Sequence, residues 1–278
     1  MSDIVLSAGV RANLLQLQQT SDLITQTQTR LATGKRVNSA LDNAINFFTA
    51  QGLDNRASDL SALLDNMSNA INTIQAANNG ITSITKLVQS QQSLASQAQQ
   101  TTDTNVRATL ASQFDALTAQ IAQLAGDSGF NGINLLAGNT LTVTFDETGN
   151  STTAVAGVDY STVGNVQTNL SIDGAVSAHN SWAAVSDIQA SSATLTTALT
   201  DLRSESQTLS ANLSTVQIRQ DFTKATINTL QTGSSSLTLA DSNEEGANLL
   251  ALQTRQQLST TALSLASQAD QNVLRLFQ

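Results

Sequence analysis

The chain has no cysteine and no proline, and its 278 residues include one histidine, one tryptophan and one tyrosine. Without cysteine there can be no disulfide, no thiolate nucleophile and no metal site held by thiolates. The single histidine, His179, excludes sites built from several imidazoles, and no G-x-S-x-G motif accompanies it to support a serine nucleophile. We therefore expect neither an enzyme nor a protein that binds a cofactor or a metal ion.

Positive charge is also scarce, with 12 Lys and Arg against 21 Asp and Glu. A nucleic-acid partner would require a basic face that replaces counterions, so we expect none. No apolar run approaches the roughly 18 residues of a membrane-spanning helix, so we expect no membrane insertion. The first residues have no cationic stretch followed by a long apolar run, and therefore predict no standard secretory signal.

Apolar side chains instead recur at alternating steps of three and four residues over most of the chain. One run extends from Leu60 to Ala98, another from Val185 to Leu230, and a shorter face from Val106 to Leu124. This spacing gathers the apolar residues on one helix face and is typical of coiled coils. The sequence therefore predicts a mainly α protein, in which long antiparallel helices form a coiled-coil or bundle rod.

Polar residues mark the expected helix boundaries. Thr102 or Asp103 is placed to cap the helix that carries the Val106 face. The Gly-Ser-Ser-Ser run at 233–236 is expected to end the longest helix, and the Ser-Asn-Glu-Glu run at 242–245 reads as a capping box for the last one.

Both ends of the chain carry the same helical period, with little apolar surface. Helices of this composition are marginal alone, so we expect the two ends to pair and neighbouring copies to cover them. The predicted polymerisation residues are Val10, Leu14, Leu17, Ile24 and Leu31 near the start, and Leu258, Leu265, Val273 and Leu276 near the end.

Only the middle of the chain alternates with period two. Residues 141–145 read as a strand, 146–150 supply turn residues, and 152–158 can return as a second strand. These observations predict a terminal-helix domain from residues 1–40 and 242–278, and a helical rod from 41–138 and 181–241. Residues 139–180 form a short β and loop insert between the halves of the rod.

Three motifs resemble those of bacterial flagellin. They read RLATGKRVNSA at residues 30–40, SGFNGINLL at 128–136 and QADQNVLRLF at 268–277, and they occur in the family's order. The resemblance covers about residues 1–138 and 182–278. It implies paired terminal helices, a helical rod with a β-hairpin, and the absence of the family's variable outer domains.

The resemblance also implies a function and partners. A flagellin is a structural subunit that polymerises into the flagellar filament for swimming motility, is secreted, and lies outside the cell. Its implied partners are further copies of itself, the flagellar type III export apparatus with an export chaperone, the filament cap and the hook-associated junction proteins. The proline-free, cysteine-free composition fits export and refolding outside the cell.

The resemblance assigns two groups of candidate residues. Arg30, Gly34, Arg36, Asn38 and Asp42 belong to an inter-domain motif, in which the charged residues could equally be solvated surface groups. Phe130, Asn131 and Gly132 belong to a loop motif, in which we expect Asn131 to be buried and to satisfy backbone groups of the turn.

Two alternative functions remain open. A hook–filament junction protein of the same superfamily would share the terminal architecture, but would form a single ring instead of a polymer of thousands of subunits. A secreted coiled-coil adhesin or binding protein would remain a discrete oligomer at any concentration.

Overall fold

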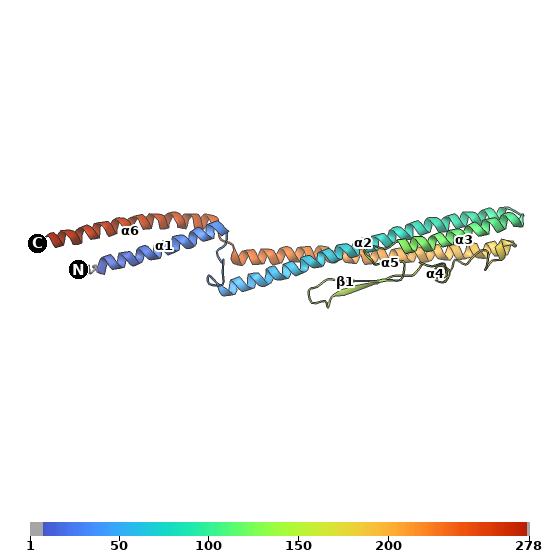
Figure 1. The fold of residues 1–278 in the computed structure, drawn as a ribbon, viewed down its shortest axis with the longest axis horizontal. Helices are drawn as coiled ribbons and strands as arrows, with labels where there is room; N and C mark the ends of the chain where they lie inside the picture. The colour runs from blue at the N-terminus through green and yellow to red at the C-terminus, as the bar shows by residue number, and fades with distance from the viewer. Residues whose placement is uncertain (1–7, 277–278) are drawn as a thin grey trace. The chain divides into compact units, whose positions relative to one another are not determined.

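A computed structural model describes the backbone of residues 8–276 and the side chains of residues 8–269, 271 and 272. The elements are α1 (Ala8–Thr33), α2 (Ala44–Gln100), α3 (Thr104–Asp127), β1 (Thr140–Thr144), β2 (Thr152–Ala156), α4 (Val163–Asn169), the 3₁₀ turn η1 (Asn180–Trp182), α5 (Val185–Thr238) and α6 (Ser242–Leu276) (Figure 1). The predicted class is confirmed: the protein is mainly α, with paired terminal helices and one small hairpin.

The chain divides into two compact units. The terminal unit comprises Met1–Asn55 and Thr229–Gln278, and the central unit comprises Arg56–Asn228. Helices α2 and α5 contribute residues to both units. The three-part division expected from the sequence, with boundaries at residues 40 and 241 and a separate β insert, stays a prediction.

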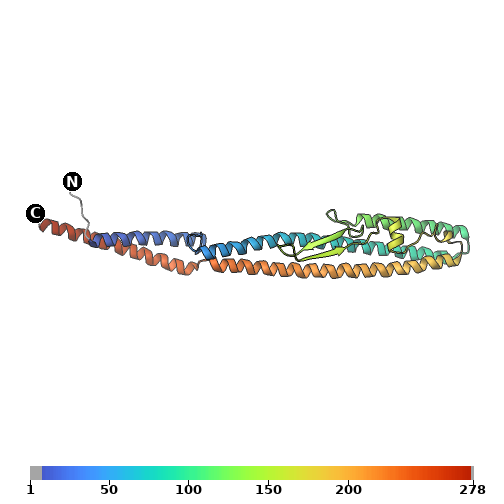
Figure 2. The ribbon, with the colours of Figure 1, turned by 90° about the horizontal axis from the view of Figure 1, so that it is seen from below.

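In the terminal unit α1 and α6 lie side by side (Figure 2). They are antiparallel, because Arg30 in the last turn of α1 reaches Glu245 in the first turn of α6. The connecting segments also pair: Lys35 forms an antiparallel bridge with Leu239, and the N–H of Ala240 donates to the carbonyl of Gly34. Gly34 has φ +68°, a conformation that favours glycine.

In the central unit α2 packs antiparallel to both α3 and α5. Gln220 on α5 donates to Ser68 on α2, and Ser206 donates to Asn78, so the two helices run in opposite directions. The core residues between the helices are apolar and fully or nearly fully buried. They include Met67, Ile74, Ile84, Val88, Phe114, Ile121, Ile188, Leu195, Leu202 and Leu209.

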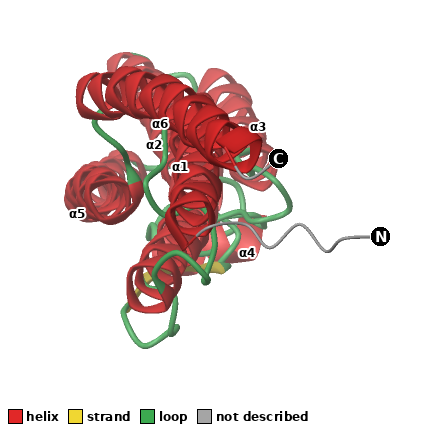
Figure 3. Ribbon diagram, turned by 90° about the vertical axis from the view of Figure 1, so that its left-hand side faces the viewer, coloured by secondary structure: helices red, strands yellow, loops and turns green. Residues whose placement is uncertain are grey.

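The strands form one antiparallel hairpin, a small fraction of the fold (Figure 3). The register runs from Thr140 opposite Ala156 to Thr144 opposite Thr152, close to the predicted strands. Alternate side chains of β1 join the central core. The turn beyond β1 is anchored by Glu147, which pairs with Arg56 of α2.

Two predicted helix boundaries are wrong. Helix α5 continues through residues 233–236 to Thr238, since Ser234 and Thr238 are buried in the terminal unit and packing outweighs the weak helix preference of Gly and Ser. The cap of α6 is Asp241 instead of Ser242, because the Asp241 carboxylate accepts the N–H groups of Asn243 and Glu244. Asp103 caps α3 as predicted.

Candidate functional site

The seam between α1 and α6 is only partly apolar. On α1 the buried residues are Val10, Thr20 and Thr27, while Leu17, Ile24 and Leu31 are half-buried. On α6 the half-buried positions include Leu249, Leu252, Gln256, Ser259 and Leu263. Hydroxyl and amide groups therefore occupy much of the surface at which the two terminal helices meet.

Other leucines of the two terminal helices remain uncovered. The exposed fractions on α1 are 39% for Leu14, 57% for Leu15 and 45% for Leu23, and on α6 they are 67% for Leu250, 67% for Leu258 and 61% for Leu265. We call these six residues the open leucines. Leu23 lies at the edge of the pairing seam, and the other five lie outside it on helix faces that the chain itself does not cover.

The predicted polymerisation set therefore divides between two surfaces. Val10, Leu17, Ile24 and Leu31 contribute to the α1–α6 seam, whereas Leu14, Leu258 and Leu265 do not. Helix α6 therefore has leucines on two faces: α1 covers the face of Leu249, Leu252 and Leu263, and leaves the face of Leu258 and Leu265 exposed. The side chains of Val273 and Leu276 lie outside the described residues.

The first motif holds the junction between the α1–α6 pair and the rest of the terminal unit. Arg30 Nη1 donates to Glu245 Oε1 at 2.9 Å, and the Glu245 side chain is 8% exposed. Arg30 Nε is buried with no hydrogen-bond partner among the described residues. Gly34 and Arg36 act through their backbones, since the Arg36 N–H donates to Thr238 and its side chain is exposed.

A turn directly after this point is built around Asp42. Asp42 Oδ2 accepts the N–H groups of Asn38 and Ser39 at 3.0 Å each, and Asn38 Nδ2 donates to the carbonyl of Lys35. The N–H of Ser39, then that of Asn38, lowers the pKa of the Asp42 carboxyl below its ordinary value, with a smaller contribution from the charge of Arg30. Asn38 and Asp42 thus fix the backbone between α1 and α2.

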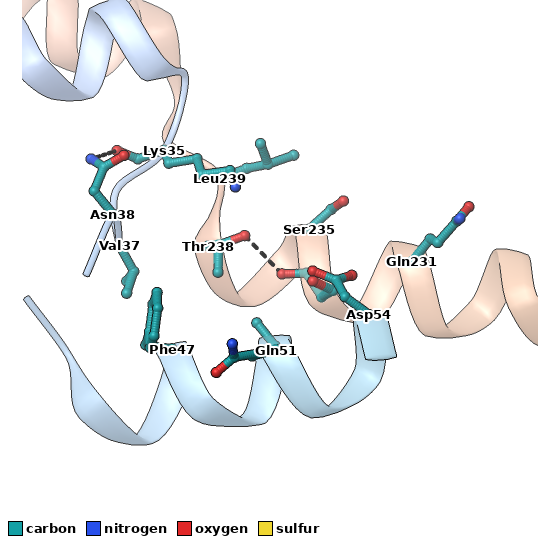
Figure 4. A pocket seen from close by; sticks show the side chains of 12 residues that line it. Lys35, Val37, Asn38, Phe47, Gln51, Asp54, Gln231, Ser235, Thr238 and Leu239 are labelled. Atoms are coloured by element: carbon teal, nitrogen blue, oxygen red, sulfur yellow. Dashed lines mark hydrogen bonds between the residues drawn. The ribbon is translucent and has the colours of Figure 1, made fainter. Parts of the chain in front are cut away.

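This turn lies beside a cavity of about 540 Å³ (Figure 4). Phe47 of α2 points toward Val37, and Lys35 and Asp54 bring charges of both signs to the lining. Three nearby apolar side chains are strongly exposed, with fractions of 98% for Leu41, 80% for Ile45 and 60% for Phe48. The part of the chain that the structure describes contains no cluster of His, Asp and Glu able to hold a metal ion, and none of its helices is long and apolar enough to span a membrane.

The loop motif forms a tight two-residue turn in the central unit. Phe130 and Ile133 exchange backbone hydrogen bonds at 2.9 and 3.0 Å. Between them Asn131 has φ +48° and Gly132 has φ +81°. Positive φ at both central residues defines a type I′ turn, for which Asn-Gly is strongly preferred. Asn131 is exposed, so its expected burial is wrong.

The buried asparagine of this loop is Asn134. Its Nδ2 donates to the carbonyls of Ala125 and Gly126 at 2.8 Å each, and its Oδ1 accepts the N–H of Leu136. Asn134 therefore satisfies carbonyls at the end of α3 and fixes the loop against that helix. The sequence does not distinguish Asn134 from Asn131, since both asparagines stand in the same motif on either side of Gly132.

Profiles of two protein regions match most of the chain. The bacterial flagellin N-terminal helical region matches residues 8–140, and the bacterial flagellin C-terminal helical region matches residues 192–277. The chain belongs to the bacterial flagellin family. The residues between the two flagellin matches include the hairpin, α4 and the beginning of α5.

Individual flagellins match over shorter stretches. Flagellin A of Rhizobium meliloti is 51% identical over 49 residues, which are 18% of this chain and 12% of that protein. Flagellin C of Rhizobium meliloti strain 1021 is 49% identical over 49 residues, which are 18% and 15% of the two chains. The chain thus matches less than one sixth of the length of these relatives. The crystal structure of Bacillus cereus flagellin is similar with a TM-score of 0.48 at 16% identity, over 57% of this chain and 88% of that one.

Proposed function

We propose that this chain is a structural subunit that polymerises into the bacterial flagellar filament and serves swimming motility. The flagellin family supports this function, and so do the open leucines of α1 and α6. A filament requires contacts that repeat from one copy to the next without closing. No chemical step belongs to this role, so the protein is not an enzyme and needs no cofactor.

The open leucines are the observation that carries the proposal. Six large apolar side chains of this one helix pair are exposed, and burying each gains roughly 1 kcal/mol or more. The seam within the chain is too polar to hold the pair firmly by itself. Neighbouring copies would cover the open leucines and offset the loss of conformational entropy in the terminal helices.

The same proposal assigns roles to the motif residues and partners. Arg30, Gly34, Asn38 and Asp42 hold the junction between the terminal helix pair and the helices that follow, while Asn131 and Gly132 shape the loop beside α3. Secretion by the flagellar type III export apparatus with an export chaperone, and contact with the cap and hook-associated proteins, follow from the filament role. The final location is then extracellular, in the flagellum.

Seeded assembly tests the proposal. Purified chain is mixed with short filament fragments, and elongation is followed by electron microscopy and sedimentation. We expect growth from the ends of the seeds, with a critical concentration that rises about tenfold or more when Leu258 and Leu265 are both changed to Ala. The matched control changes both Leu249 and Leu263 to Ala. These two leucines lie in the α1–α6 seam within the chain, so their loss should also lower the stability of the monomer.

Failure of the unaltered chain to elongate in any salt condition would contradict the filament role. If the Leu258 and Leu265 variant elongated normally, the filament role would stand but the open leucines would not be its contact surface.

A further inference from the structure

A recess of about 320 Å³ lies between α1 and α6, on one flank of the pair. Its lining combines apolar side chains, including Leu23 and Leu252, with the charged side chains of Arg30, Arg255 and Glu245. Two guanidinium groups therefore face a single carboxylate. This excess of positive charge stands out in a chain whose net charge is -9.

The single carboxylate does not satisfy the two cations. Glu245 forms one ion pair, with Arg30 Nη1, and its side chain is almost fully buried. Arg255 is exposed and has no ion pair with any residue that the structure describes. The recess therefore presents an uncompensated guanidinium beside apolar surface, which is complementary to a carboxylate that arrives together with an apolar side chain.

We propose that this recess binds Asp22 of a second copy of the same chain. The inference rests on the proposed filament role and names one of its contacts. Asp22 lies on α1, on the helix face opposite the α6 seam, and it is exposed. Leu15, 57% exposed, lies seven residues before Asp22 and therefore on the same face, so the two side chains present a carboxylate and an apolar group together.

Elimination among the described carboxylates of the terminal unit favours Asp22. Asp42 and Asp241 accept backbone N–H groups of their own turns, and Glu245 pairs with Arg30. Asp54 lines the separate cavity next to Phe47. Glu244 lies in the first turn of α6, where a negative charge already interacts with the helix dipole.

The contact is heterologous, because Asp22 and the recess are different surfaces of one chain. Each copy offers its α1 outer face to one neighbour and its recess to another. Contacts of this kind propagate as an open polymer unless their rotation closes a ring.

Charge exchange tests the contact directly in the full chain. The critical concentration for polymer formation is measured by sedimentation for Asp22→Arg, for Arg255→Asp and for the double variant. Each single change brings like charges together at the contact and should raise the critical concentration about tenfold. The double variant restores opposite charges in exchanged positions, so its critical concentration should return to within about threefold of the unaltered chain.

A second measurement identifies the partner residue without a functional readout. Arg255→Lys keeps the positive charge and places an amine where a carbodiimide can join it to a neighbouring carboxylate. Polymers of mixed ¹⁴N and ¹⁵N copies are cross-linked and digested, and mass spectrometry should find residue 255 joined to Asp22 of the other isotope. Arg203→Lys, which changes an arginine of the central unit, is the control and should not join to Asp22.

The outcomes separate this contact from the filament role. If the unaltered chain forms no polymer, the filament role fails. If it polymerises, but the double variant is no better than the worse single variant, the pairing of Asp22 with the recess is wrong. Rescue of Arg255→Asp by Glu244→Arg instead of Asp22→Arg would overturn the choice of Asp22. Asp22 and Arg255 are exposed, so circular dichroism melting of monomers that carry changes at these two residues should remain unchanged.

Discussion

The terminal and central units are built from the same kind of long helix but pack very differently. The buried residues of α1 are Val10, Thr20 and Thr27, two of them hydroxyl side chains. Those of α3 include Phe114 and Ile121, which are fully buried. A core of large apolar side chains stabilises the central unit within one chain, whereas the α1–α6 pair keeps several of its leucines in contact with water.

Under the proposed filament role, this difference lets one chain supply both a stable body and an assembly surface. Apolar area that is buried within the chain contributes to the stability of the monomer and is unavailable for association. Apolar area left on α1 and α6 lowers the stability of the monomer but remains for neighbouring copies. We therefore expect equivalent truncations in the two units to have unequal effects on the monomer.

The largest effect is expected from removing an aromatic ring from the central core. Phe114 is fully buried, and its ring packs edge-on against Trp182 with 5.3 Å between centroids. Phe114→Ala should lower the free energy of unfolding of the central unit by about 3–5 kcal/mol. Trp182 is the only tryptophan of the chain, so urea denaturation followed by its fluorescence reports on this unit.

The matched change in the terminal unit is Ile24→Ala, in the half-buried seam of α1. Its free energy of unfolding, measured on the monomer by circular dichroism, should fall by about 1 kcal/mol or less, because the Ile24 side chain is already partly hydrated. An equal loss of unfolding free energy in Phe114→Ala and Ile24→Ala would mean that the α1–α6 pair is packed as tightly as the central core.

A second comparison uses two glycines of the same helix, α2. A Cβ atom at Gly80, in the central unit, would approach Leu136 Cδ1 to 2.7 Å and would also overlap Ser128. Gly52, in the terminal unit, has nothing within 4 Å of such an atom. Gly80→Ala should therefore lower the free energy of unfolding by about 1–3 kcal/mol, because the 128–136 loop must move.

Gly52→Ala should instead raise the free energy of unfolding by up to about 1 kcal/mol, because alanine is the better helix former. Chemical denaturation of both monomers measures the two changes. Stabilisation by both substitutions would show that the loop yields easily and that α2 does not need a glycine at residue 80.

The sequence predicted the long helices and the buried faces of α2 and α5 well, since most positions of the runs from Leu60 to Ala98 and from Val185 to Leu230 are buried or half-buried. On α3 the predicted face is confirmed at Phe114 and Ile121, but Val106 at its start is 45% exposed and the neighbouring Arg107 is buried. The Arg107 Nε donates to the carbonyls of Ala98 and Thr101, and its Nη1 donates to that of Ala183. Apolar periodicity cannot foresee a guanidinium that is buried by hydrogen bonds to carbonyls.

The candidate site was harder to predict than the fold for a related reason. Leucines of α6 occur on two faces, and periodicity alone does not say which face the chain covers itself. Asn131 and Asn134 are equally polar in sequence, yet only Asn134 lies within reach of the last carbonyls of α3. Alanine, serine and threonine are abundant on both faces of these helices and can pack in a seam. Tertiary packing therefore decides which face is buried.

The smallest effect concerns an acidic group at the edge of the central core. Burial raises the pKa of the Glu205 carboxyl above its ordinary value. Burial also raises the pKa of the nearby Tyr160 hydroxyl, with smaller contributions from the charges of Glu205 and Asp201. The folded protein therefore disfavours the charged form of Glu205 relative to the unfolded chain.

The sign of the pH dependence follows from this direction. Because the folded state holds the Glu205 proton more tightly than the unfolded state, its stabilising contribution is complete below the unfolded pKa and is lost as pH rises through the folded pKa. Glu205→Gln should raise the free energy of unfolding at pH 7 by a fraction of a kcal/mol, discounted for the solvent that still reaches the group. At pH 4 the variant and the unaltered chain should differ less.

Urea denaturation at both pH values, followed by Trp182 fluorescence, measures the difference. The control is Asp221→Asn on the same helix, where the carboxylate is exposed and pairs with Lys224, and where no such gain at pH 7 is expected. Loss of stability in Glu205→Gln at pH 7 would mean that the carboxylate is held by favourable contacts that outweigh its desolvation. The central unit, and not only the terminal helices, would then depend on charge for its stability.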